Sequence, residues 1–516
     1  MKLLIALVVA SLSGFIALSY EILWIRVYGF ATEGEPKSFG FLLSAYLTGL
    51  ALGALFARNY CDRTDTEQDA DPLFFVGLFF LVGNVAAFLV VPLTAELISA
   101  RGLDPDQMLP FFALAAAGLG TGFPLLSHYA IPADQNAGAR LSYLYVANII
   151  GSTIGSLATG LWLLDVLSLR VLNLGLVLLG VAMSCLLMAA AVTQPQARRA
   201  IGASYALIAV AVISSSPTLY AALYEKLLYQ DDYNAGLLFA HTVENRSGVV
   251  NLSESGTVYG GGSYDGQMNV DPRPDQDTNR VLRAYMIPGF HPAPRDILMI
   301  GLGSGSWLEV LSNLDDVRSI TVVEINGGYV EIMRRTPLVA PSVDHPKVEI
   351  IIDDGRRYLN HTTRSFDVIV QNTIVYWRAH AANLLSREYL ELTGQHLNPG
   401  GVIYLNSTQS TAAQKTVSTV FPYALRYQNM MIAGFDPITW DPDRWRNSLE
   451  AWTIQGRHVI DPLLDVGVLD EILAQDTWRG GPTWEDRTRI LARTMDETII
   501  TDDNMSTEWW AFDTYP

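Results

Sequence analysis

Cysteine and positive charge are both scarce in this sequence of 516 residues. Cys61 and Cys185 lie in or beside hydrophobic stretches, which excludes a disulfide framework and a cysteine-rich metal site. We therefore expect no bound metal. Lysine and arginine total 34 against 52 acidic residues, for a formal net charge of −18. Because no segment clusters the basic residues that phosphate neutralisation needs, we exclude a nucleic-acid-binding protein.

Long apolar stretches are concentrated in the first 225 positions. A membrane-spanning helix needs about 20 mainly apolar residues. The sequence therefore predicts a polytopic α-helical membrane domain over residues 1–225. The basic residues that flank its helices number six on one side and five on the other, which gives no clear orientation. About seven stretches are long enough to span: roughly 3–28, 38–57, 73–95, 109–128, 142–164, 168–193 and 201–222.

A few polar residues interrupt these stretches, among them Glu21, Arg26 and Asn148. Charged and amide groups are costly in hydrocarbon, so they either face a polar cavity or lie near the membrane interface, where Glu21 and Arg26 can pair or snorkel. Small residues lie close to Asn148 and permit close contact between helices. These are Gly151, Gly155 and Gly160.

From about residue 235 the pattern changes to short strands, turns and amphipathic helices, which indicates an independent α/β part. Residues 235–295 contain strand-like pieces at 238–244, 247–252 and 257–259 and then a helix at roughly 277–287, which predicts a small β-hairpin platform. Residues 296–410 alternate strands and helices, which predicts a Rossmann-type domain with its ligand at the carboxyl ends of the strands. Residues 411–516 form a mixed carboxy-terminal extension.

The strongest local feature is an apolar strand, 297–300, followed at once by Gly301-Leu-Gly303-Ser304-Gly305 and the start of a helix. Glycine is needed where the backbone approaches a ligand closely. Ser306 stands where a dinucleotide fingerprint has its third glycine, so an adenosyl ligand is favoured over NAD.

Acidic residues follow the next two strands of the predicted sheet. Glu324 ends the strand 319–323, where it can accept both ribose hydroxyl protons. Asp354 follows the strand 348–352, where it can receive an adenine amino group. Glu324 makes the adenosyl interpretation much more specific than the glycines alone.

Across about 240–406 this part resembles the spermidine synthase family of aminopropyltransferases, and with its apolar half the chain resembles the membrane-fused spermidine-synthase-like proteins of bacteria. The matching segments are Tyr264-Asp265-Gly266-Gln267, His291-Pro292, Gly301 to Gly305, Val323-Glu324-Ile325 and Asp354-Gly355. The resemblance implies a methyltransferase-like Rossmann fold that binds S-adenosylmethionine or its decarboxylated form. It also implies that Glu324 holds the ribose, that Asp354 holds the adenine, and that Gln267 belongs to the cofactor site.

The sequence departs from the family where the reaction takes place. The family's D-S-S-D segment, whose first Asp deprotonates the attacking amine, is replaced by Asn372-Thr373-Ile374-Val375. An amide is a poor general base. The family's upstream Y-H-E aligns with Asn279-Arg280-Val281. The acidic residue is therefore lost, and an arginine stands next to its position. We therefore expect Asn372 at the cofactor, Thr373 and Arg280 at the substrate, and a site unsuited to cationic polyamines.

The loop Gly301–Gly305 has Ser304 where the family has an Asp that repels the carboxylate of intact S-adenosylmethionine. Our hypothesis is that Ser304 lets the protein accept S-adenosylmethionine itself and transfer a methyl or aminocarboxypropyl group. In the following segment, Trp377 can cover the adenosyl group and Arg378 can bind an anion, or both can belong to an ordinary surface loop. Three residues are candidate catalytic bases: His380, Asp265 and Tyr264.

Two classes of function remain open from the sequence. The first is a membrane-bound transferase with an amphiphilic or anionic small-molecule or lipid acceptor, within which true spermidine synthesis is the less favoured reaction. The second is a non-catalytic nucleoside sensor or a polyamine-related transporter, in which Glu21 and Asn148 line a polar path. An enzyme needs its nucleoside from the cytoplasm, so we place the α/β part on the cytoplasmic side of the bacterial inner membrane. A homo-oligomer is left open.

Overall fold

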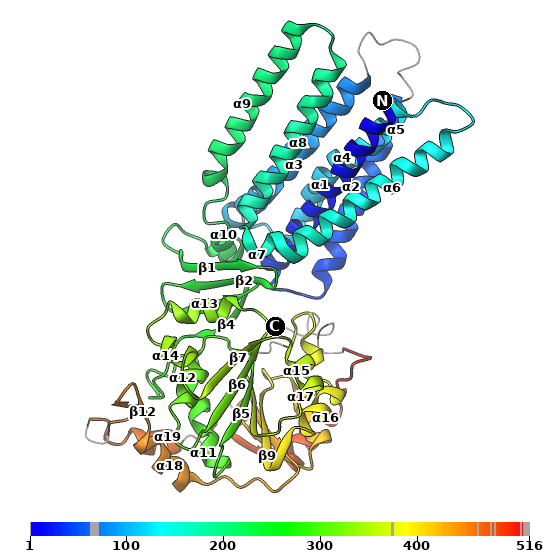
Figure 1. Cartoon of the computed structure of the whole chain (residues 1–516). Helices are drawn as coiled ribbons and strands as arrows, with labels where there is room; N and C mark the ends of the chain where they lie inside the picture. Colours follow the sequence, from blue (N-terminus) through cyan, green and yellow to red (C-terminus); the bar gives the residue numbers. More distant parts are fainter. Residues whose placement is uncertain are drawn as a thin grey trace. The chain divides into compact units, whose positions relative to one another are not determined.

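The computed structural model describes residues 2–61, 72–372, 376–461, 464–474, 477–478, 481–505 and 508. The chain forms two compact units. The helical unit comprises Met1–Leu238 with Glu244–Gly248, and the α/β unit comprises Phe239–Val243 with Val249–Pro516. Figure 1 shows both units, coloured along the sequence, and each is described separately below.

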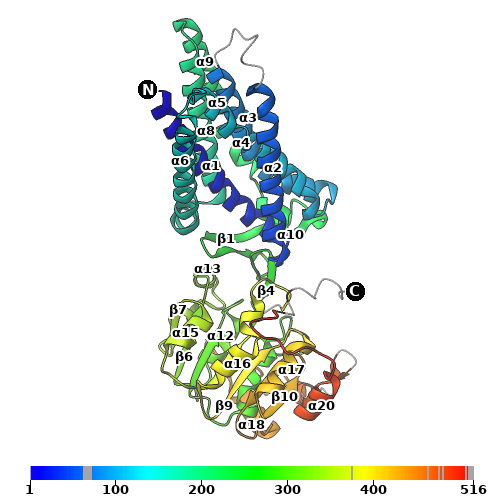
Figure 2. The same ribbon diagram turned by 90° about the vertical axis from the view of Figure 1, so that its right-hand side faces the viewer.

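Seven helices in the described part of the helical unit are long and apolar enough to cross a membrane. This number agrees with the sequence prediction, and the location in a membrane stays a prediction. In both views the long helices run side by side (Figures 1 and 2). The candidate spans are Leu3–Ala31, Lys37–Cys61, Leu73–Arg101, Pro105–Ala130, Ala137–Val166, Leu169–Ala191 and Pro195–Leu219.

The bounds of the individual helices differ slightly from those of the spans. Two of the spans each combine several consecutive helical segments. Short helices then close the unit. In order they are α1 (Lys2–Ala31), α2 (Lys37–Cys61), α3 (Pro72–Arg101), η1 (Pro105–Met108), α4 (Leu109–Gly120), α5 (Gly122–Ala130), α6 (Ala137–Ala158), η2 (Thr159–Leu163), α7 (Leu164–Val166), α8 (Leu169–Ala191), α9 (Pro195–Leu219), α10 (Leu223–Tyr229) and η3 (Gln230–Asp232).

Small residues let α6 pack closely on α1. A Cβ atom added to Gly151 would lie 1.7 Å from the carbonyl oxygen of Ser11, and one added to Gly155 would lie 2.4 Å from that of Phe15. Such contacts are open only to glycine, which confirms the predicted small-residue face at these two positions. A Cβ at Gly160 would meet only Ile22, at 3.9 Å, so this glycine does not take part.

The α/β unit begins with a four-stranded antiparallel sheet, in the order β1 (Phe239–Asn245), β2 (Gly248–Ser253), β3 (Thr257–Gly260) and β4 (Ser263–Gln267). The register between β3 and β4 shifts, because Val258 pairs with Gly266 while Tyr259 pairs with Tyr264. Asp265 is therefore the extra residue of a β-bulge, a device that re-aims a side chain.

The predicted helix at 277–287 is wrong in type and extent. The structure has a 3₁₀ helix, η4 (Val281–Met286), followed by the short α11 (Ile287–Phe290). Arg280 adopts a left-handed conformation with φ +53°, which starts a new helix instead of continuing one. The Asp277 carboxylate accepts the backbone N–H of Leu282 at 3.2 Å, so the turn before η4 is fixed by a side chain.

A second sheet of eight strands has the order β16-β10-β11-β9-β8-β5-β6-β7. Strands β5 to β9 are parallel, and β11 runs antiparallel to both β9 and β10. This is the doubly wound Rossmann-type arrangement that the sequence predicted, extended by strands from the region after residue 410. The strands are β5 (Asp296–Ile300), β6 (Ser319–Glu324), β7 (Val348–Ile352), β8 (Phe366–Gln371), β9 (Leu397–Asn406), β10 (Tyr423–Tyr427), β11 (Met430–Gly434) and β16 (Trp484–Asp486).

Helices cover both faces of this sheet (Figures 1 and 2). Alternate residues of β5 belong to different cores: Ile297 packs with α12 and Leu298 with α16 and α17. The remaining elements are α12 (Ser306–Ser312), α13 (Gly328–Arg334), α14 (Ala340–Val343), α15 (Gly355–His361), η5 (Ala381–Leu384), α16 (Arg387–Gly394), α17 (Thr411–Val420), α18 (Pro442–Ala451), β12 (Thr453–Ile454), β13 (Arg457–His458), α19 (Val468–Leu473), β14 (Thr477–Trp478), β15 (Gly481–Pro482) and α20 (Arg487–Arg493).

Candidate active site

The glycine loop lies between β5 and α12, at the point where the strand order of the sheet reverses. Gly301, Gly303 and Gly305 all have positive φ, at +84°, +54° and +76°. A Cβ on Gly305 would also lie 2.6 Å from Cε of Met333. The three glycines are therefore required by the backbone itself, and ligands of open α/β sheets bind at this point.

Glu324 ends β6 beside this loop and is almost completely buried, with 4% of its surface exposed. Its carboxylate accepts the backbone N–H groups of Leu302 and Asn326, each at 2.8 Å. Burial raises the pKa of Glu324 to about 7, the nearby charge of Asp265 adds to the rise, and the backbone donors oppose it. At neutral pH the carboxyl group is therefore close to half ionised.

The β-bulge turns Asp265 toward the glycine loop. Its carboxylate accepts the hydroxyl of Tyr329 and lies 3.8 Å from Nη1 of Arg378. Arg378 also donates to the carbonyl oxygen of Gly260 at 2.7 Å. Burial raises the pKa of Asp265, although Arg378 and Tyr329 act in the opposite direction. Asp265 is thus a better proton acceptor near neutral pH than an ordinary aspartate.

A cavity of about 210 Å³ opens between the platform and the carboxyl ends of the parallel strands. Five of the predicted site residues line it: Tyr264, Asp265, Gly303, Ser304 and Asn372. The other lining residues are Gly266, Asn279, Arg283, Met299, Leu302, Trp307, Asn406, Thr408 and Asn429.

Four residues that line the cavity are joined by a series of hydrogen bonds that begins at Arg283, and we call them the cavity wall. Arg283 donates to Oδ1 of Asn429 at 2.8 Å, and Nδ2 of Asn429 donates to Oδ1 of Asn406 at 2.8 Å. Nδ2 of Asn406 then donates to Oδ1 of Asn372 at 3.1 Å. Guanidinium groups only donate, so each amide in the chain accepts on its Arg283 side and donates on the other.

Ser304 and Tyr264 make local contacts at the cavity. The hydroxyls of Ser304 and Ser306 are 2.8 Å apart, and Ser306 accepts the backbone N–H of Asn269 at 2.9 Å. The Tyr264 hydroxyl donates to Oδ1 of Asn279 at 3.0 Å. Burial raises the pKa of Tyr264, which keeps its phenol protonated at neutral pH.

Besides Gly301, Gly305 and Glu324, three more predicted site residues do not line the cavity. Gln267 directs its amide to the carbonyl oxygen of Ser255 at 3.3 Å. Asp354 caps α15 by accepting the backbone N–H of Arg357 at 2.7 Å. Arg280 is exposed, and only its backbone carbonyl contributes, by accepting Nε of Arg283 at 2.9 Å.

The segment after β8 is only partly described. Thr373 lies outside the described residues. Trp377 is half-buried with its ring 5.2 Å from that of Tyr376, and His380 is exposed with φ +68° at the start of η5. Neither lines the cavity, whereas Arg378 reaches it through Asp265.

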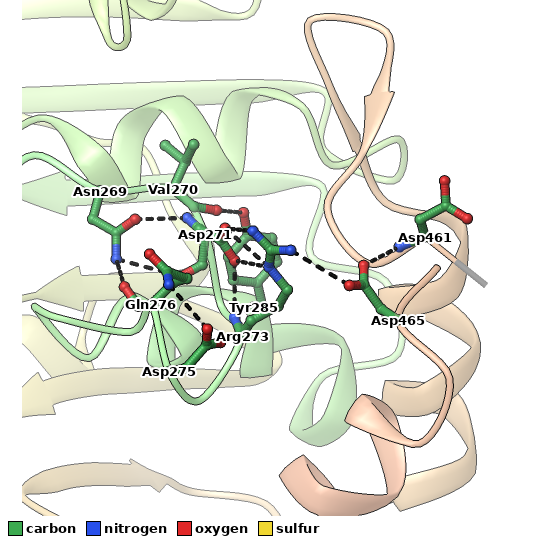
Figure 3. Close-up of polar contacts among 9 residues, drawn as sticks. All are labelled: Asn269, Val270, Asp271, Arg273, Asp275, Gln276, Tyr285, Asp461 and Asp465. Carbon is green, nitrogen blue, oxygen red and sulfur yellow. Dashed lines mark hydrogen bonds and ion pairs between the residues drawn. The ribbon is translucent and has the colours of Figure 1, made fainter. Parts of the chain in front are cut away.

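The loop after β4 is braced by charged residues. Arg273 pairs with Asp271 and lies 3.4 Å from Oδ1 of Asp465 (Figure 3). The hydroxyl of Tyr285 donates to the carbonyl oxygen of Val270 at 2.6 Å. These contacts hold the loop that carries Asn279 to the cavity wall, so they position the site without lining it.

The end of the described chain also contacts the α/β unit. Arg356 forms a two-pronged pair with Asp502 at 2.8 and 2.5 Å, and Ser386 donates to the same carboxylate at 2.6 Å. Glu508 accepts the backbone N–H of Ala382 at 2.8 Å. Both acids are engaged in contacts with α15 and η5, and neither lines the cavity.

Sequence reasoning missed Arg283, Asn406 and Asn429. Asn406 could have been found, because it ends β9 next to β8 and the ends of adjacent parallel strands meet at one edge. Arg283 was obscured by the assumption of a regular helix over 277–287. Asn429 lies in the turn between β10 and β11 and carries no local signal.

Residues 285–431 match the family described as the spermine/spermidine synthase domain. Spermidine synthase of Dictyostelium discoideum is 35% identical over 135 residues, which are 25% of this chain and 47% of that relative. A polyamine aminopropyltransferase of Escherichia fergusonii is 30% identical over 147 residues, 27% of this chain and 51% of that relative. The chain spans about half the length of these curated relatives.

Two solved structures are also similar, spermidine synthase in complex with the transition state analogue AdoDATO and spermidine synthase from Thermotoga maritima. Their identities are 20% and 22%, and each covers 45% of this chain, with 83% and 84% of their own chains. The TM-scores are 0.34 and 0.33, so the fold rests on the strand order above. Residues 285–431 of the α/β unit thus match a spermine/spermidine synthase domain, and the same chain contains a region of long apolar helices.

Proposed function

We propose that this protein is a membrane-bound transferase that uses an S-adenosyl-type sulfonium nucleoside and whose acceptor is not a simple polyamine. The observation that carries the proposal is the lining of the cavity. Among the described residues that line the cavity, Asp265 is the one with a carboxylate. The cavity wall consists of Arg283 and three asparagines. A polyamine carries several positive charges and would be repelled by such a wall.

The nucleoside is held on the sheet side of the cavity. Glu324 lies at the tip of β6, where an ionised carboxylate can accept ribose hydroxyl protons through lone pairs that the two backbone donors leave open. Asp354 is at the tip of β7 and has a second oxygen available for the adenine amino group, beside its capping bond. The glycine loop allows the backbone to approach the sulfonium end.

Asp265 is the proposed general base. The acceptor's nucleophilic atom attacks a carbon bonded to the sulfonium sulfur, the carbon–sulfur bond breaks with its electron pair going to sulfur, and the acceptor's proton passes to Asp265. The raised pKa of Asp265 suits this step, and Tyr329 fixes the carboxylate by hydrogen bonding. His380 and Tyr264 are weaker candidates, since His380 is exposed away from the cavity and Tyr264 stays protonated.

Attachment to the membrane suits an amphiphilic acceptor, small molecule or lipid, because the helical unit keeps the transferase where such molecules concentrate. The nucleoside is made in the cytoplasm, so the α/β unit is assigned to the cytoplasmic side of the membrane. Fusion of a reporter to the carboxyl terminus tests this assignment, and a periplasmic signal would contradict it.

Product analysis tests the proposed reaction. The full-length protein in detergent is incubated with S-adenosylmethionine or its decarboxylated form and with lipid or polyamine extract. Formation of methylthioadenosine indicates propyl-type transfer, and S-adenosylhomocysteine indicates methylation. Asp265→Asn is the matched control, since it keeps the size of the side chain and removes the base. If neither product forms above the level of this variant, the protein is a nucleoside sensor or a transporter component.

A further inference from the structure

Arg283 is a buried cation without a carboxylate partner. It is 6% exposed and lines the cavity, and it donates hydrogen bonds to Oδ1 of Asn429 and to the carbonyl oxygens of Arg280 and Asn279. Among the described residues no acid lies within 4.0 Å of it. Burial lowers the pKa of Arg283, and Tyr404 and the charge of Asp277 act in the opposite direction.

Arg426 is a second buried arginine of the α/β unit, and unlike Arg283 it has a carboxylate partner. It is 7% exposed and pairs with Glu485 at 2.6 Å, and Glu485 also pairs with Arg493 at 2.9 Å. A charge taken out of water is costly unless an opposite charge accompanies it. Arg283 has no such ion pair among the described residues, and its guanidinium lies over the ring of Trp307, 5.9 Å from the ring centroid, so an anionic ligand group in the cavity would supply the missing opposite charge.

The three asparagines continue the series of hydrogen bonds from Arg283 along the cavity wall. Each amide accepts a hydrogen bond from the preceding residue in the series. Asn372 therefore accepts from Asn406 on Oδ1, and its NH₂ group is left to donate to a ligand. Asn372 ends this series at the strand tip of β8, beside the glycine loop. Both ends of the wall thus offer hydrogen-bond donors, which favour a ligand group that carries negative charge.

The size of the cavity limits which part of a ligand it holds. Its volume of about 210 Å³ is below the ~300–1,000 Å³ of pockets that enclose a whole small molecule. Glu324 and Asp354, which are proposed to hold the ribose and the adenine, do not line it. The cavity therefore fits the amino-acid tail of the nucleoside, and Ser304 adds no negative charge beside it.

We infer that Arg283 and the Asn429–Asn406–Asn372 chain bind the carboxylate of the donor nucleoside, and so select intact S-adenosylmethionine over its decarboxylated form. This inference rests on the proposed function, because it assumes that an S-adenosyl nucleoside occupies the site. It makes Arg283 a specificity-determining residue and places the discrimination at the cavity wall, with Ser304 permitting it.

Titration calorimetry of the full-length protein with the two nucleosides tests the inference. Arg283→Met should weaken the binding of S-adenosylmethionine by about 30-fold or more and change that of the decarboxylated form less than threefold. Asn429→Asp should have the same selective effect, because the new carboxylate pairs with Arg283 internally and leaves no unpaired buried charge. This second variant keeps the test valid if Arg283→Met folds poorly.

Arg426→Met is the control, since it removes a buried arginine of similar exposure that has its own partner. It should lower stability and leave the ratio of the two affinities unchanged. The inference is overturned if Arg283→Met and Asn429→Asp weaken both nucleosides equally, or if the wild type prefers the decarboxylated form. Failure of the wild type to bind either nucleoside would instead refute the proposed function itself.

Discussion

Glu324 should make nucleoside binding depend on pH in the neutral range. Its carboxyl group has a pKa of about 7 in the empty protein, because it is buried and lies near Asp265. Ribose hydroxyls donate to the ionised form, so binding selects that form and lowers the pKa. Affinity should therefore fall as the pH decreases through 7.

The magnitude follows from the ionised fraction of Glu324. With a pKa of about 7, about 91% of the protein carries the carboxylate at pH 8 and about 9% at pH 6. The apparent dissociation constant is the intrinsic one divided by the fraction of competent protein. It should thus rise about tenfold from pH 8 to pH 6, which is 1.4 kcal/mol.

The assay is equilibrium dialysis of 5′-methylthioadenosine, which has neither the carboxylate nor the amine of the full donor and so reports on the nucleoside half alone. Glu324→Gln should bind more weakly at pH 8 and show no slope. Asp265→Asn should keep the slope but move its midpoint to lower pH, because the charge that raises the pKa of Glu324 is removed. A flat profile in the wild type, or the same slope in Glu324→Gln, would refute the assignment.

Three further outcomes are expected. Asp265→Asn should lower turnover by about 100-fold to 10,000-fold while methylthioadenosine still binds at pH 8; undiminished turnover would exclude it as the base. Gly305→Ala should cost about 1–3 kcal/mol, measured as a lower unfolding temperature, because φ is +76° and Met333 blocks the Cβ. Asp502→Asn should cost less than about 1 kcal/mol, since its pair with Arg356 is partly exposed, and should leave nucleoside affinity unchanged; a large loss of affinity would show that the tail closes the site.

The glycine loop and Glu324 could be predicted because their signals are local. A strand, a run of glycines and a helix start occupy consecutive residues, and the acid at the end of the next strand reaches the same edge by the rules of parallel sheets. The bulge that aims Asp265 was not visible in the sequence, since it depends on the register between β3 and β4. Its segment could be recognised, but not the orientation of its side chain.

Arg280 and Arg283 show why the acceptor side was harder to predict. Both arginines lie in one short segment, and only the conformation of the chain decides which one turns inward. The left-handed Arg280 ends the preceding turn, which leaves its side chain exposed, and the 3₁₀ turn then buries Arg283. A regular helix over 277–287 would give the two arginines different orientations. Because the helix type was predicted wrongly, Arg280 was predicted at the site and Arg283 was missed.

Asn372 has a different meaning once its neighbours are known. Taken alone, an asparagine in place of the acid that the resemblance implies indicates lost catalysis, which also fits a sensor. In the structure its oxygen is fixed by Asn406, and the series leads back to a buried arginine. A site that had merely decayed would have no need of a desolvated cation at its wall, because such a charge destabilises an empty protein. The wall of donors therefore supports the proposed change in ligand charge, and Asp265, the proposed base, lines the same cavity.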